Sequence, residues 1–188
     1  MTRSKALLAA SAALALAPLV AGEAFAQMRS GQMRSEMAMP MPAMPSAQTA
    51  SFLTMAGEGD IYEITSSQMA LARSRSPGVR AYAQKLIDHH TRLTNTTLSA
   101  AKAASVAPPP PILTAPKRAM IDQLIAAGPM QFDGVYLQQQ VMAHQQALAL
   151  QQDYAASGDT PQLRAAAAGA VPLVQQHLGE AQSMQAGM

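Results

Sequence analysis

The sequence predicts an all-α fold, in which four long helices form a bundle and one long crossover carries a short extra helix. From residue 51 onward, Ala, Leu, Gln and Met recur with helical periodicity, and no strand-like alternation of useful length appears. Proline and glycine signals divide this region into two pairs of long segments. A long proline-rich stretch separates the two pairs and predicts the crossover.

Start and stop signals predict the first pair of helices at about residues 51–74 and 77–105. Ser76 is a good N-cap for the second of them, and Pro77 occupies its first turn, where the missing N–H does no harm. Four consecutive prolines, at residues 108–111, then end this helix. The two segments are therefore expected to form the first helical hairpin.

The crossover is expected to hold the short helix at about residues 116–127. The second pair of long helices is expected at about residues 131–156 and 161–184, because Gly158 ends one segment and Thr160-Pro161 starts the next. Two hairpins joined by one long connection have the connectivity of a ferritin-like four-helix bundle. We expect this domain to occupy residues 49–186.

The N-terminus predicts export. A basic start, an apolar stretch over residues 6–21 and the small-x-small site Ala24-Phe25-Ala26 follow one another as in a secretory signal peptide. Residues 1–26 are therefore predicted to be cleaved after Ala26, which would place the mature chain in the periplasm or outer envelope. A membrane anchor is the alternative, although the stretch is short for a span and Pro18 interrupts it.

Residues 27–48 are rich in methionine and proline, and this composition predicts a disordered tail. Met37, Met39 and Met41 place thioethers at every second residue, and soft sulfur ligands favour copper in its reduced state. Methionine is also a common filler, so the tail is compatible with a copper site or with no binding function at all.

Composition excludes several classes of function. The 188-residue chain carries 13 basic and 11 acidic side chains, and this small imbalance gives no case for nucleic-acid binding. It has no cysteine, so neither disulfides nor lipid attachment through cysteine is available. No segment after the leader is long and apolar enough to cross a bilayer. Motifs of the common catalytic schemes are absent from the sequence, which therefore does not predict an enzyme.

One polar residue on each long helix predicts a metal site. His90, His144 and His177 share helix faces with apolar side chains three, four and seven residues away, so their imidazoles should point inward. Glu63, His90 and His144 lie at similar depths in their helices, whereas His177 is expected roughly 5 Å from that level. A carboxylate and two or three imidazoles could bind zinc, copper, iron or manganese. His89 is turned about 100° away from His90 and is expected at the edge of the interface.

The same residues have a structural interpretation. Neutral histidines in a core need hydrogen-bond partners, and Glu63, Ser66, Ser67 or the other histidines could supply them without any metal. A diiron centre is disfavoured, because bundles of that type use Glu-x-x-His pairs and none occurs here. The lack of these pairs also counts against a redox enzyme that handles oxygen.

Spaced blocks along the chain resemble a known family, the bacterial domain of unknown function 4142 (DUF4142). The resemblance covers about residues 50–185 and rests on the following segments: Tyr62-Glu63-Ile64, Ser66-Ser67, Leu86 to Thr91, Phe132 to Tyr136, Val141 to His144, Tyr154-Ala155, Gly158-Asp159, Val171-Pro172 and His177-Leu178.

The resemblance implies an exported, ferritin-like bundle without a demonstrated activity. The family's glutamate maps to Glu63 and its three histidines to His90, His144 and His177, whereas the aspartate that precedes the second-helix histidine is replaced here by His89. If that aspartate orients the histidine, Asp88 is not an obvious substitute. The sequence thus predicts an envelope bundle that binds a transition metal, or else a structural or interaction module of the envelope. A protein partner, a membrane surface and any oligomeric state all remain open.

Overall fold

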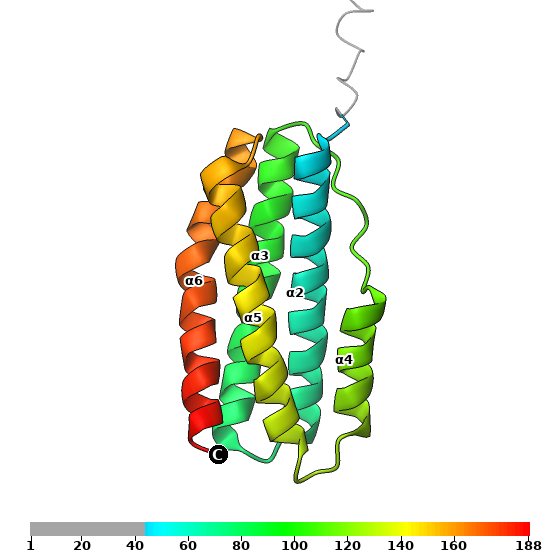
Figure 1. Cartoon of the computed structure of the whole chain (residues 1–188), viewed down its shortest axis with the longest axis vertical. Helices are drawn as coiled ribbons and strands as arrows, with labels where there is room; N and C mark the ends of the chain where they lie inside the picture. Colours follow the sequence, from blue (N-terminus) through cyan, green and yellow to red (C-terminus); the bar gives the residue numbers. More distant parts are fainter. Residues whose placement is uncertain (1–43) are drawn as a thin grey trace, which may run out of the picture. The chain divides into compact units, whose positions relative to one another are not determined.

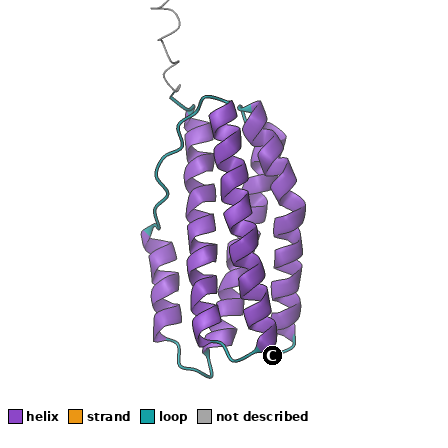
Figure 2. Cartoon of the chain, turned by 180° about the vertical axis from the view of Figure 1, so that it is seen from behind, coloured by secondary structure: helices purple, strands orange, loops and turns teal. Residues whose placement is uncertain are grey.

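The computed structural model describes residues 44–188, and its helices form a four-helix bundle with one crossover (Figure 1). The four long helices are α2 (Ala47–Arg73), α3 (Pro77–Ala103), α5 (Phe132–Ser157) and α6 (Pro161–Ala186). The crossover carries the short helix α4 (Ala115–Ala126). The described residues contain no strand (Figure 2). The predicted fold class is therefore confirmed. The predicted signal peptide and most of the methionine-rich tail lie outside the described residues.

Local signals explain where the first hairpin begins and turns. The Ser46 side chain accepts a hydrogen bond from the Thr49 N–H at 3.0 Å, so α2 begins four residues before the position that the sequence indicated. The Ser76 side chain accepts in the same way from the Val79 N–H at 3.3 Å. Pro77 then fills the first turn of α3, as predicted.

The four long helices are arranged so that each contacts two others. α2 packs against α3 and α5, and α6 packs against the same two helices. The short helix α4 lies outside this group, against α2 and α5 (Figure 1). Arg73 fixes the end of α4, because its guanidinium donates to the carbonyl oxygens of Leu124 and Ala127 and lies 4.6 Å from the centroid of the Phe132 ring.

A buried polar layer divides the core into two apolar clusters. One cluster is built around Tyr82, Leu86 and Tyr136, and the other around Phe52 and Leu163. Between the residues of these clusters lie buried polar side chains that the hydrophobic effect alone would not place in a core. They are Glu63, Ser66, Ser67, His90, Gln139, Gln140, His144, Gln151 and His177. This layer contains all four residues that the sequence singled out. Within residues 44–188, no helix is long and apolar enough to span a membrane.

Candidate metal centre

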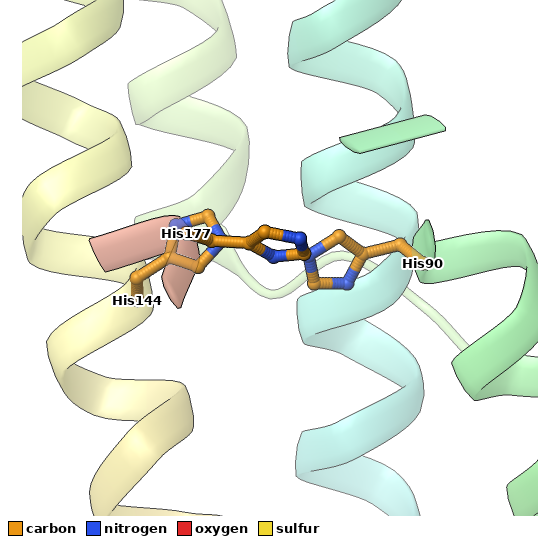
Figure 3. A group of neighbouring side chains, drawn as sticks. All are labelled: His90, His144 and His177. Atoms are coloured by element: carbon orange, nitrogen blue, oxygen red, sulfur yellow. The ribbon is translucent and has the colours of Figure 1, made fainter. Parts of the chain in front are cut away.

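The structure brings three of the predicted ligands together. His90 from α3, His144 from α5 and His177 from α6 turn their rings toward one another in the interior of the bundle (Figure 3). Each is at most 2% exposed. One ring nitrogen from each lies within 4.8 Å of the corresponding nitrogens of the other two. The ring of His177 therefore reaches the other two histidines despite the offset expected from its depth in the helix.

The spacing of the rings matches the spacing around one bound ion. The ring centroids are 5.5 Å apart for His90 and His144, 5.5 Å for His90 and His177, and 5.3 Å for His144 and His177. For metal–nitrogen bonds of about 2.0–2.1 Å, three imidazoles around one ion have centroids about 5.2–5.5 Å apart. Ligand nitrogens in such a site lie about 3.4 Å apart. The ring nitrogens lie within 4.8 Å of one another in the structure, and rotation of the rings would bring them to the shorter separation around an ion.

Two of the rings are held by hydrogen bonds on the side away from the centre. The Nδ1–H of His90 donates to Oδ1 of Asp60 at 2.8 Å, and the other oxygen of this carboxylate accepts from the Thr94 hydroxyl at 2.7 Å. The Nδ1–H of His144 donates to the backbone carbonyl of Gln140 at 2.9 Å. Such bonds fix the tautomer and leave the Nε2 lone pair free, which is how metal-binding histidines are oriented.

His177 is held by another histidine. Its Nε2 lies 2.8 Å from Nδ1 of the half-buried His89, and the two rings stack with centroids 5.1 Å apart. If His177 donates from Nε2, its Nδ1 carries the free lone pair that faces the centre. His89 thus lies at the edge of the interface, as predicted, and its contact with His177 gives it a positioning role.

The atoms that face the centre have no hydrogen-bond partner among residues 44–188. They are Nε2 of His90, Nε2 of His144 and Nδ1 of His177. Oε2 of Glu63 is also unpaired, but Glu63 does not belong to the group of ligand atoms that lie within 4.8 Å of one another. The other oxygen of Glu63 lies 3.7 Å from Nδ1 of His144. Buried polar atoms are nearly always paired, so three unpaired ring nitrogens that converge in one place indicate a site that a ligand completes.

Burial and charge set the protonation of these histidines. Burial, followed by the charges of the neighbouring histidines, lowers the pKa of His177 to about 2. Burial also lowers the pKa of His144, although Glu63 opposes the effect. Burial acts on His90 as well, but the hydrogen bond and charge of Asp60 outweigh it and raise this pKa above its usual value. His144 and His177 are therefore neutral at pH 7, which is the form that binds metal.

Sequence reasoning identified the residues at the centre but not their partners. The serines suggested as partners do not contact the histidines, because Ser66 accepts from the Gln140 amide and Ser67 pairs with the Tyr136 hydroxyl. Asp88 bonds to the Gln84 side chain on the surface. The carboxylate that orients His90 is Asp60, three residues before Glu63 on α2. That spacing places two acids on one helix face, which is a signal that the sequence does contain.

We expect Asp60→Asn to weaken metal binding by about 10–100-fold, because a neutral amide no longer holds the His90 ring as a charged acceptor. Asp88→Asn is the matched control, since it makes the same change on an exposed residue that does not touch His90. Competition titration with a chelator measures both affinities. Equal affinities for the two variants would contradict the assigned role of Asp60.

Comparisons with known proteins agree with this fold. A family model described as "Domain of unknown function (DUF4142)" matches residues 34–184. No curated protein matches the sequence. The structure is similar to a DUF305 fragment from Deinococcus radiodurans, with 15% identity and a TM-score of 0.67, over 78% of this chain and 100% of that one. It is also similar to CopM in the Cu(I)-bound form, with 17% identity and a TM-score of 0.63, over 74% of this chain and 96% of that one.

Proposed function

The chain belongs to the DUF4142 family, and we propose that it binds one transition-metal ion through His90, His144 and His177, with Glu63 as a fourth ligand. The observation that carries this proposal is the set of unpaired atoms at the centre of the polar layer. Each imidazole spends one nitrogen on an outer partner and points the other toward the same space. One ion would satisfy the three ring nitrogens, whereas a hydrogen-bonded packing cluster would have paired them with each other.

The donor set narrows the choice of ion. Three imidazoles and one carboxylate suit zinc and copper better than manganese, which prefers oxygen ligands. Iron also binds imidazole, but no Glu-x-x-His pair is present to supply the carboxylates of a diiron centre. The likeness in fold to CopM in its Cu(I)-bound form makes copper the first ion to test.

The proposal includes a location. If residues 1–26 direct export, the bundle meets its metal in the periplasm or outer envelope. Fractionation of cells that produce the full chain tests this location. We expect a mature protein that begins at Gln27 in the envelope fraction, and the full-length chain in the cytoplasm would contradict it.

Titration of the metal-free protein tests the proposed function. We expect one equivalent of Zn²⁺ or Cu²⁺ to bind and to raise the melting temperature, because the ion binds the folded state alone. A variant lacking residues 27–48 separates the bundle site from the methionines of the tail and should bind the same single ion. If the protein refuses zinc, copper, iron and manganese, the polar layer is a packing device and the alternative role as a structural module of the envelope stands in its place.

Binding should weaken in acid. His144 and His177 have lowered pKa values and are already neutral, so the competing proton resides on His90, whose pKa is raised. Above that pKa the affinity should be nearly constant. Below it, one proton leaves for each ion bound, and the affinity should fall by about tenfold per pH unit. Calorimetric titration in buffers of different ionisation enthalpy measures the proton released, and no release at any pH would contradict the assignment.

A further inference from the structure

Two cavities in sequence lead from the surface toward the centre. The inner cavity has a volume of about 30 Å³, and its lining includes Asp60, Glu63 and His90. The outer cavity has a volume of about 150 Å³, and its lining includes Met55 and Glu58. The two cavities share four of their lining residues, which are Gly59, Lys117, Ala143 and Ala147. The two cavities therefore meet along the seam between α2 and α5.

We propose that the metal ion reaches the centre through this passage and that the Lys117 side chain is its gate. The inference rests on the proposed function, because it concerns the route to that same site. Lys117 comes from α4, the short helix that lies over α2 and α5 (Figure 1). The crossover thus supplies the side chain at the point where the outer and inner cavities meet.

The walls of the passage suit a cation. Met55 at the outer end is 46% exposed and offers a thioether, and Glu58 beside it offers a carboxylate. The inner end is lined by Glu63, which is 2% exposed and has an oxygen without a partner among the described residues. Between these ends the α5 side chains are the methyl groups of Ala143 and Ala147, which leave room for a small ion.

The contacts of Lys117 are those of a side chain that can move aside. Its ammonium lies 4.6 Å from the centroid of the Tyr62 ring and donates to Oε1 of Gln146 at 3.2 Å. Burial lowers the pKa of Lys117, and the charges of Glu63 and Glu58 partly oppose this effect. Lys117 and Glu63 both line the inner cavity, so the two side chains border the same space. An incoming cation must pass or displace this positive charge, which raises the barrier for both uptake and release.

Other faces of the centre are more closely covered by the residues that the structure describes. Apolar clusters pack on both sides of the polar layer, and His89 covers the ring of His177. A cavity of about 100 Å³ under the proline-rich crossover reaches Asp60. Neither Glu63 nor His90 lines that cavity, whereas both line the inner cavity of the passage.

Stopped-flow binding of Cu²⁺ to the full metal-free chain tests the passage. The chain has four tyrosines and no tryptophan, and Tyr62 and Tyr136 lie in the bundle core, so quenching of tyrosine fluorescence reports uptake. Ala147→Leu should fill the passage and slow uptake and release together by about tenfold or more, with the dissociation constant unchanged within about threefold. Lys117→Met should speed both uptake and release by about tenfold.

Two controls make these rates specific. Ala149→Leu adds the same bulk to an exposed position on α5, and Lys85→Met removes a positive charge that is paired with Glu180 outside the passage. Both should keep the rates of the unmodified chain. Circular dichroism checks that Ala147→Leu folds. If this variant does not fold, the uptake and release rates of Lys117→Met test the passage.

The possible failures are distinguishable. Unchanged rates in Ala147→Leu and Lys117→Met, with Cu²⁺ still bound at one equivalent, would overturn the passage and leave the metal site intact. A change in affinity without a change in the uptake rate would overturn it as well. An unmodified chain that binds no Cu²⁺ would overturn the passage and the copper assignment together.

Discussion

His90→Ala is expected to abolish stoichiometric metal binding while the bundle stays folded. The substitution removes one of three imidazole ligands, and its effect should exceed the roughly 10–100-fold loss that follows from removing an outer partner of a ligand. The helices should persist, because His90 belongs to neither of the apolar clusters that hold the bundle together. Metal analysis after gel filtration measures the first effect, and circular dichroism measures the second.

The matched control is Leu86→Ala, one turn before His90 on the same helix and equally buried. It leaves a cavity and should cost about 2–5 kcal/mol of stability without changing the amount of metal bound. The pair separates loss of a ligand from loss of packing. If the two variants lose metal to the same extent, the loss reflects a loosened bundle, and His90 is not shown to be a ligand.

Glu63→Met is expected to stabilise the metal-free protein and to weaken metal binding. The glutamate is buried with one oxygen unpaired among residues 44–188, and a methionine of similar volume removes that cost. Exchange of buried ionic groups for apolar ones commonly raises the free energy of unfolding by about 1–4 kcal/mol. In saturating metal the unmodified chain should be the more stable of the two, because it binds the ion more tightly and its free energy of unfolding rises more.

Urea unfolding with and without metal measures both parts of this prediction. The matched control is Gln151→Met, which changes another buried polar residue of the same layer, one outside the proposed ligand set. Its effect on stability should not depend on added metal. A Glu63→Met protein that is less stable than the unmodified chain in the metal-free state would show that the carboxylate serves packing, as the structural interpretation holds.

The fold could be predicted from the sequence because its signals are local. Caps such as Ser76-Pro77, the proline run at residues 108–111 and the periodicity of the apolar residues act within one or two turns. The start of α2 was missed because Ser46, just after a proline, was assigned to the tail although its side chain caps the helix.

The centre could be predicted only in part, because it depends on how the helices are placed against each other. The inward direction of the histidines follows from helical spacing, but their common level does not. Depth counted from each helix start does not settle whether four side chains meet, because it ignores how the helices are placed along the bundle axis. Partners on other helices, such as Asp60 for His90 or His89 for His177, involve contacts between residues 30 and 88 positions apart. A local pattern such as the spacing of Asp60 and Glu63 marks a shared helix face, but it does not identify the partner on another helix.

Anomalous diffraction from crystals of the metal-loaded protein tests the central claim most directly. Data collected on either side of the absorption edge of copper or zinc locate the ion without reference to any ligand assignment. The account predicts one peak among the rings, about 2.0–2.2 Å from Nε2 of His90, Nε2 of His144 and Nδ1 of His177, with Glu63 as the fourth neighbour. Metal-loaded crystals with no peak at this position, or with peaks only at surface residues, would contradict it.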